Sequence, residues 1–261
     1  MESYSSAAYR SFKTFIGELT AVAAGVYVGI QEVIPLVEKN GTADPWSVAA
    51  QRHGVVVNSL RSEQVAQSSV RLNLVSLYSG FDLFMADTRS QFHALREQQW
   101  VQHDGDTPFV ALARNTPSAS GVHIKRLGRH RIATMDHYRL VRNAIAHPRS
   151  EAIEASKTFF ASNAELLTQV RTEYGMRSAP NAIQHLTFHD IKLLAKLALD
   201  LTKAIDLDLD PGDACLRSML SSKSTDRTKT PARNQRSLES WLRTHYGVSA
   251  ERARRIVQSN S

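Results

Sequence analysis

The sequence predicts an all-α protein: a bundle of about five helices with a tethered C-terminal helical hairpin. Apolar residues recur every three or four positions over long segments, and no run shows the alternation of a β-strand. The periodic segments are joined by mostly modest connections, as in helical bundles. At 261 residues, 42% hydrophobic and 22% charged, the chain can bury a substantial core.

The first two helices are long. The first is expected to end near Pro35, and its most apolar run, residues 19–30, is too short to cross a bilayer and predicts a buried core helix. Its apolar stripe consists of Phe12, Phe15, Leu19, Val22, Val26, Ile30 and Val33. After loop residues 40–46, the second helix runs from about Ser62 to about Leu95. Its stripe consists of Val70, Leu74, Leu77, Phe81, Phe84 and Phe92.

Three more helices follow a turn-rich connection at residues 102–121. The third begins near Arg129 and should end near Ala146 or His147, because the residue before a proline is disfavoured in the α region. We expect Pro148 to open the fourth helix, whose stripe is Ile153, Phe160, Leu167 and Val170. The fifth begins after Thr187, a plausible N-cap with Asp190 three residues later, and has the core stripe Ile191, Leu194, Ala198, Leu201 and Ile205.

Composition predicts three regions: a bundle over residues 1–220, a basic flexible linker over 221–236, and a small basic hairpin over 237–261. The net charge is +7, and from Lys223 onward nine Lys or Arg residues face only three acids. A near-neutral body with a basic tail indicates a polyanionic partner, although many such tails serve only solubility.

We expect a cytoplasmic protein with no membrane segment, no cofactor and no metal. The N-terminus lacks the basic region of a secretory signal. Cys215 is the only cysteine, which excludes an intrachain disulfide and a Cys-based zinc site. His185 and His189 have i, i+4 spacing, but a single such pair is more typical of a helix surface than of a metal site.

The segment "RLVRNAIAHPRSE", residues 139–151, places Arg142, Asn143 and His147 within six positions of an aliphatic helix end. Asn143 and His147 share a helical face, and a slight unwinding before Pro148 would let Arg142 reach the same phosphate as His147. Arginine binds phosphate oxygens with a planar fork, and histidine exchanges protons near neutral pH. Asparagine can hydrogen-bond the histidine or the phosphate.

This Arg-Asn-x-x-x-His pattern at a helix end resembles the signature of the HEPN superfamily, whose active members are metal-independent endoribonucleases. The resemblance covers roughly residues 60–207 and includes a preceding long helix with an acid, Asp82, among apolar residues. The bare arginine–histidine spacing is weak and occurs three times, at Arg142–His147, Arg131–His137 and Arg96–His103. Only the first has the adjacent asparagine and the position before a proline.

The resemblance implies attack of a ribose 2′-hydroxyl on the adjacent phosphate, at a composite site in a homodimer with an isologous interface. His147 would be the general base or acid, Arg142 would stabilise the phosphorane and Asp82 would orient the motif. The implied substrate is single-stranded or tRNA-like RNA, within a bacterial defence or toxin system that includes an antitoxin or other partner protein. Candidate phosphate contacts are Arg139, Arg149, Arg252, Arg254 and Arg255. Arg149 stands where adenylylated relatives carry tyrosine, so control by adenylylation is not supported.

Other interpretations of the same residues stay open. Arg142 could form a structural ion pair with Asp136 or Asp82, and His147 could simply complement the negative end of the helix dipole. The protein would then be a non-catalytic scaffold or a nucleic-acid-binding subunit with the bundle as its dimerisation module. A DNA-binding regulator acting through residues 236–258 would require a rigidly held hairpin, which the composition of the linker disfavours.

Overall fold

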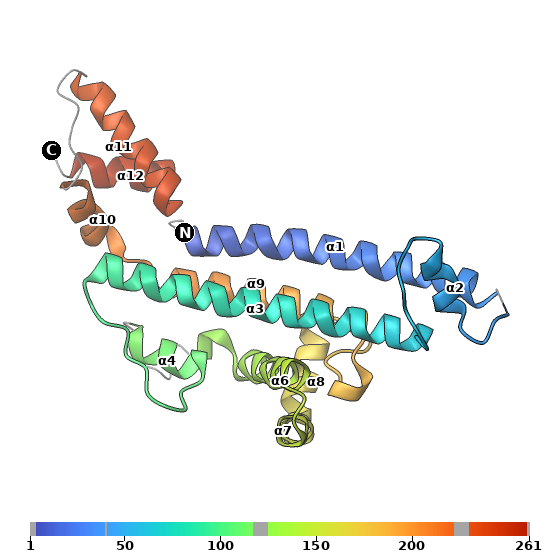
Figure 1. Cartoon of the computed structure of the whole chain (residues 1–261). Coiled ribbons are helices and arrows are strands. Elements are labelled where there is room, and N and C mark those ends of the chain that lie inside the picture. Colours follow the sequence, from blue (N-terminus) through green and yellow to red (C-terminus); the bar gives the residue numbers. More distant parts are fainter. Residues whose placement is uncertain (1–3, 40, 117–124, 222–229, 260–261) are drawn as a thin grey trace. The chain divides into compact units, whose positions relative to one another are not determined.

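The structure, a computed structural model, describes residues 4–39, 41–116, 125–221 and 230–259 (Figure 1). Within these ranges the secondary structure is helical with no strand, which confirms the predicted all-α class. The helices are α1 (Ala7–Glu38), α2 (Pro45–Gln51), α3 (Ser62–Arg96), α4 (Pro108–Asn115), α6 (Arg129–Ala146), α7 (Ser150–Ser162), α8 (Ala164–Glu173), the 3-10 turn η1 (Ile183–His185), α9 (Phe188–Asp208), α10 (Gly212–Ser221), α11 (Pro231–Tyr246) and α12 (Ala250–Gln258). Short helices therefore supplement the five predicted long segments.

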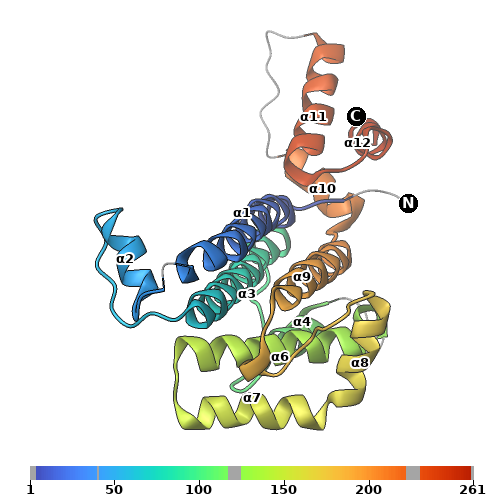
Figure 2. The same cartoon turned by 90° about the vertical axis from the view of Figure 1, so that its right-hand side faces the viewer.

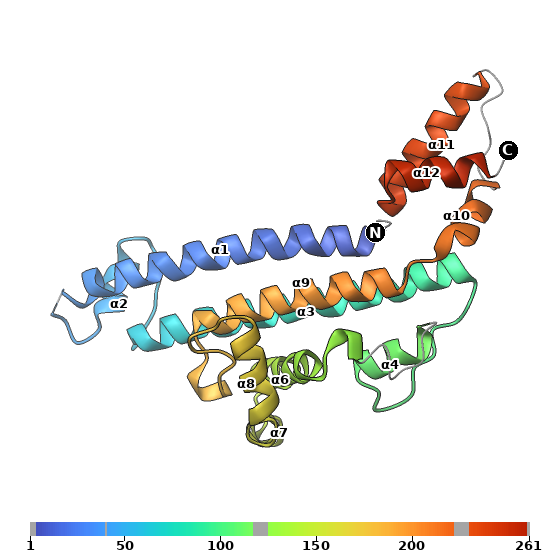
Figure 3. The same ribbon diagram turned by 180° about the vertical axis from the view of Figure 1, so that it is seen from behind.

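The chain divides into two compact units. The motif unit consists of residues 15–81 and 129–199, and the terminal unit consists of residues 1–14, 82–128 and 200–261. In the motif unit, α6 and α7 run antiparallel side by side, and α8 follows at the far end of α7 (Figure 2). In the terminal unit, α10, α11 and α12 lie together (Figure 3).

Helix α1 differs from the buried core helix that the sequence predicts. One face is buried, including Phe12, Ile16 and Val37, but Val22 and Leu36 on the other face are 61% and 63% exposed. The helix also continues past Pro35 to Glu38, so it is long and apolar enough to cross a bilayer. The short apolar run therefore underestimated both the length and the exposure of this helix.

The predicted core stripes of the second and fifth helices are confirmed. The six predicted residues of α3, from Val70 to Phe92, are all buried, and so are the five predicted residues of α9. The N-terminus of α9 is capped as expected: the Thr187 N–H donates to Asp190 Oδ2 at 2.8 Å, and Thr187 Oγ1 accepts from the His189 N–H at 3.2 Å. In the motif unit, the Tyr27 ring of α1 stacks on Phe188 at the start of this helix, with centroids 4.6 Å apart.

The connection between α6 and α7 is longer than expected. Helix α6 ends at Ala146, as predicted, but Pro148 is not part of α7. The extended backbone of Arg149 (φ −91°, ψ 148°) makes it the N-cap, and the helix begins at Ser150. The predicted fourth helix is also divided, since α7 ends at Ser162 and α8 begins at Ala164 on the other side of Asn163.

The predicted linker is helical over part of its length. Residues 231–236 form the first turns of α11, where Pro231 occupies a favourable N-terminal position, and residues 222–229 lie outside the described residues. The predicted helix boundaries beyond them are confirmed: Gly247 is the left-handed C-cap of α11, and Ser249 is the N-cap of α12. The hairpin packs against α10 and Tyr4 in one hydrophobic cluster, so it is not merely tethered.

Candidate functional site

The three motif residues lie at the last turn of α6. The His147 N–H donates to the Asn143 carbonyl oxygen at 2.8 Å, so the helical hydrogen-bond pattern extends to the histidine. The chain then bends at once, because the Arg149 N–H donates to the His147 carbonyl oxygen at 2.7 Å. The prediction that the helix unwinds before Pro148 is therefore wrong. The backbone departs from the helical hydrogen-bond pattern only after His147.

Asn143 positions the arginine rather than the histidine. Arg142 Nη1 donates to Asn143 Oδ1 at 3.0 Å, and both side chains are partly buried. The amide oxygen therefore fixes one edge of the guanidinium. This arrangement differs from the expected hydrogen bond of the asparagine to the histidine or to the phosphate, and it turns Arg142 and Asn143 into one preorganised group.

His147 opens onto a pocket at the α6–α7 corner. The pocket has a volume of about 710 Å³ and is lined by Asn143, His147, Arg149, Glu151 and Ala152. His147 and Arg149 are exposed. The i, i+4 spacing of Asn143 and His147 predicted their shared surface. Glu151 and Ala152 were not predicted, although an acid in the first turn of a helix is a common N-terminal signal that could have identified Glu151.

Arg139 is engaged in an ion pair within its own helix. Its Nε lies 3.1 Å from Asp136 Oδ1, and the side chain is 30% exposed. Burial raises the pKa of Asp136, and the hydrogen bond from Arg139 opposes that rise. Arg139 is therefore a poorer phosphate contact than its sequence position indicated, because an anion would have to compete with the carboxylate.

Asp82 lies in α3 and belongs to the terminal unit, where it is partly buried. The motif residues belong to the other unit. The proposed role of Asp82 in orienting the motif stays a prediction.

The competing arginine–histidine pair on α6 is structural. Arg131 donates through Nε to Glu173 Oε1 at 3.0 Å, which helps to hold the pKa of that carboxyl below its ordinary value. His137 is fully buried and donates through Nε2 to the Asn181 carbonyl oxygen at 3.0 Å. Desolvation lowers its pKa to about 4. A histidine that stays neutral and inaccessible cannot exchange protons with a substrate.

The third match, Arg96 and His103, spans the end of α3 and a turn. Arg96 lies over the Phe92 ring at 5.2 Å and donates to the Asp210 carbonyl oxygen at 3.4 Å. His103 is exposed in the following connection. Arg142 and His147 are therefore the one match of the three whose histidine lines a pocket together with the residue that holds its arginine.

The predicted phosphate contacts in the C-terminal hairpin separate into two kinds. Arg252 is only 3% exposed and bonds Asp210 at 2.6 Å and Asp213 at 2.7 Å, so its prediction as a phosphate contact is wrong. The hydrogen bond with Asp210 raises its pKa further. Arg255 pairs with Asp213 at 2.7 Å but is about half exposed, and Arg254 is exposed.

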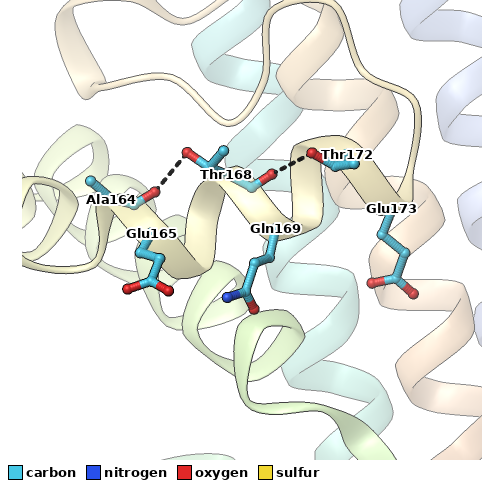
Figure 4. A pocket seen from close by; sticks show the side chains of 6 residues that line it. All are labelled: Ala164, Glu165, Thr168, Gln169, Thr172 and Glu173. Carbon is cyan, nitrogen blue, oxygen red and sulfur yellow. Dashed lines mark hydrogen bonds between the residues drawn. The ribbon is translucent and has the colours of Figure 1, made fainter.

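Neither a cluster of metal ligands among the described residues nor the pocket along α8 offers a better anion site. The described residues contain no group of three His, Cys, Asp or Glu side chains that could hold a metal. His185 and His189 lie in η1 and α9, not on one helix. A second pocket lies along α8, where Thr168 and Thr172 donate back to their own helix (Figure 4). Its ionisable lining residues are both acidic, Glu165 and Glu173, so the lining offers an anion no positive charge.

Comparisons with protein-family models, with curated proteins and with solved structures found no match to this chain. Function must therefore be inferred from the chain's own residues and from the resemblance of its motif.

Proposed function

We propose that the protein is a metal-independent endoribonuclease whose site contains Arg142, Asn143 and His147. The observation that carries the proposal is the α6–α7 corner. There an accessible histidine shares an open pocket with the asparagine that holds the adjacent guanidinium at 3.0 Å. A general base, a rigid phosphate-binding fork and room for a substrate are the three features that this chemistry needs.

In the proposed reaction, neutral His147 accepts the proton of a ribose 2′-hydroxyl. The 2′-oxygen forms a bond to the adjacent phosphorus, and the bond from phosphorus to the 5′-oxygen of the next nucleotide breaks. Charge that develops on the non-bridging oxygens is stabilised by Arg142, and Arg149 adds a second positive charge at the pocket. The products are a 2′,3′-cyclic phosphate and a 5′-hydroxyl end.

The leaving 5′-oxygen needs a proton, and His147 is already engaged with the 2′-hydroxyl. We propose that the partner subunit's His147 donates it, which makes the functional form a homodimer with two α6–α7 corners facing each other across a two-fold axis. The exposure of His147 and Arg149 is compatible with such a face. Cytoplasmic location, a tRNA-like substrate, a defence or toxin role and an antitoxin-type partner protein rest on the resemblance alone and stay predictions.

The test is cleavage of mixed tRNA and of unstructured RNA in the presence of EDTA. We expect His147→Ala and Arg142→Ala each to lower the rate by at least about 100-fold, the usual contribution of a proton-transfer group and of a group that stabilises transition-state charge, respectively. His103→Ala and Arg52→Ala are matched controls, since both remove exposed side chains of the same type elsewhere in the chain. The product ends are checked by direct phosphorylation of the 5′-hydroxyl.

Cleavage that requires a divalent metal, or that persists in both site variants, would contradict the proposal. A chain that dimerises but cleaves neither RNA would instead support the scaffold interpretation, in which the bond between Arg142 and Asn143 is purely structural.

A further inference from the structure

Helices α11 and α12 are joined by a three-residue turn. Helix α11 ends at Tyr246, residues 247–249 make the turn, and α12 begins at Ala250. Gly247 adopts a left-handed conformation with φ +56°, and Ser249 Oγ accepts from the Arg252 N–H at 3.1 Å. Figure 2 shows α12 nearly end-on while α11 runs across the view, so the two helices cross steeply. This is the geometry of a helix-turn-helix.

The hairpin is held rigidly within the terminal unit. Leu242, Val248 and Ile256 are buried in one cluster with Leu216 of α10 and with Tyr4. The two buried ion pairs of Arg252 attach α12 to the residues at the start of α10. These contacts remove the main objection to a DNA-reading role, which was that a tethered hairpin could not hold a recognition helix in place.

The N-terminal segment fastens the same hairpin from the other side. Arg10 Nη2 donates to the carbonyl oxygens of Thr244 at 2.9 Å and of His245 at 3.0 Å, and the Ser5 N–H donates to Tyr246 O at 3.0 Å. A Cβ on Gly247 would lie 2.7 Å from Ser5, so the turn has space only for glycine. The C-terminal carbonyls of α11 are therefore satisfied by an adjacent segment, which fixes the helix end.

The outer face of α12 carries side chains that can read base edges. Ala253, Ile256 and Val257 are buried on the inner face. The exposed residues recur at the spacing of one helical face and are Glu251, Arg254, Arg255 and Gln258. Arginine, glutamine and glutamate are the side chains that hydrogen-bond guanine, adenine and cytosine edges in the major groove.

The outer face of α11 is basic. Arg233, Arg236 and Arg243 are exposed, and their spacings of three and seven residues place them on one side of the helix. None of the three has an ion pair with a described residue. Along α11 these charges span about 15 Å, which is enough to follow several phosphates of one strand.

We infer that α11 and α12 are a DNA-binding helix-turn-helix, with α12 in the major groove of a DNA duplex and the α11 arginines on its phosphates. The duplex must be DNA, because the major groove of A-form RNA is too narrow for a helix. Asp213 does not oppose this binding strongly, because Arg252 and Arg255 bond its carboxylate and offset its negative charge. The inference does not depend on the proposed nuclease, whose residues lie in the other unit.

The test is binding of the full chain to a mixed-sequence DNA duplex of about three helical turns, and to an RNA duplex of the same sequence, followed by fluorescence anisotropy over a salt series. The main variant carries Arg233→Ala, Arg236→Ala and Arg243→Ala. Its matched control carries Arg52→Ala, Arg61→Ala and Arg177→Ala, which removes the same charge from exposed positions of the motif unit. Arg254→Ala tests α12 separately.

We expect the DNA duplex to bind more tightly than the RNA duplex by at least about tenfold. The α11 triple variant should lose at least about tenfold in affinity and lower the slope of log K against log salt by about 2 to 3, whereas the control triple variant should match the wild type. Arg254→Ala should also weaken binding to the DNA.

Three results would overturn the inference. They are equal loss in the two triple variants, absence of DNA binding by a wild type whose thermal unfolding is intact, and affinity for the RNA duplex that equals affinity for DNA and falls in the α11 triple variant. The last result would assign the hairpin to RNA. In none of these cases would the EDTA-resistant cleavage test change its outcome, so the two proposals fail separately.

Discussion

Two arginine–histidine pairs lie on the same helix, α6, and they have opposite environments. Arg131 and His137, near its start, are consumed by contacts with Glu173 and Asn181. At its end, His147 lines a pocket together with Asn143, which accepts a hydrogen bond from Arg142. Both fit the same sequence pattern. The difference shows that accessibility and the partners of each group, and not spacing, decide whether such a pair can act on a substrate.

His137, the buried member of the first pair, belongs to a network that stabilises the fold. Asn181 connects its two parts, since its carbonyl oxygen accepts from His137 and its own N–H donates to Asp190 at 2.9 Å. Asp190 is fully buried and also accepts from Tyr138 Oη at 3.0 Å and from Thr187. Substitutions at this end of α6 should therefore change stability, while substitutions at the other end should change activity.

The largest effect on stability is expected for Asp190→Ala. This change leaves the buried donors of Tyr138, Asn181 and Thr187 without an acceptor, so the free energy of unfolding should fall by about 3–5 kcal/mol. Urea denaturation followed by circular dichroism measures it. Asp87→Ala, an exposed position on α3, is the control and should change little. A loss below 1 kcal/mol, roughly the value of a single ordinary hydrogen bond, would show that the network adds nothing as a unit.

The next effect is a pH dependence caused by His137. Its folded-state pKa is lowered from 6.5 to about 4, so the stability that it provides is present above pH 6.5 and is lost as the pH falls toward 4. The loss should reach about 3 kcal/mol. His137→Gln, which keeps an N–H donor but cannot be protonated, should remove this dependence. His147→Gln should retain the pH dependence. If the free energy of unfolding depends on pH in the same way in both variants, His137 is not the source of the effect.

Asp206 should oppose this acid effect, and removing it sharpens the measurement. The carboxylate is buried and accepts from the Ser6 N–H at 3.1 Å, and desolvation raises its pKa from 3.8 to about 6. Its contribution is therefore present below pH 3.8 and is lost as the pH rises through about 6. Asp206→Asn keeps an acceptor for Ser6 and should raise the free energy of unfolding at pH 7.5 by about 2 kcal/mol. Lower stability at that pH would mean that the charge on Asp206 is favourable.

Local features of this chain and the core stripes of α3 and α9 were predictable, but the partners of distant polar side chains and the exposure of α1 were not. The end of α6, the Thr187 cap and the Gly247 turn depend on a few adjacent residues, and all three are confirmed. The burial of Arg252 could not be predicted, because it requires two aspartates about 40 positions earlier in the chain to meet α12. The exposed face of α1 was missed for the same reason, since an apolar stripe does not say how much of it a neighbour covers.

The candidate site follows the same division. The i, i+4 relation of Asn143 and His147 could be predicted from helix geometry, and both residues line the pocket. The bond between Arg142 and Asn143 depends on side-chain rotamers. The presence of Glu151 in the pocket lining depends on how α7 turns back after His147. Neither can be read from the order of residues alone.

Glu151 provides the smallest and most specific test of the open end of α6. Its carboxylate lines the same pocket as His147 and Arg149, where it repels a phosphate. Glu151→Gln keeps the shape, so in a His147→Ala background, where RNA stays intact, we expect it to tighten RNA binding about twofold to fivefold, less at high salt. Glu154→Gln, which removes the same charge from an exposed position on α7, is the control and should change little. If Glu151→Gln in the otherwise unmodified protein instead slows cleavage by more than about tenfold, Glu151 takes part in proton transfer. One protomer would then hold both an acid and a base, and the site would no longer need a second copy of His147.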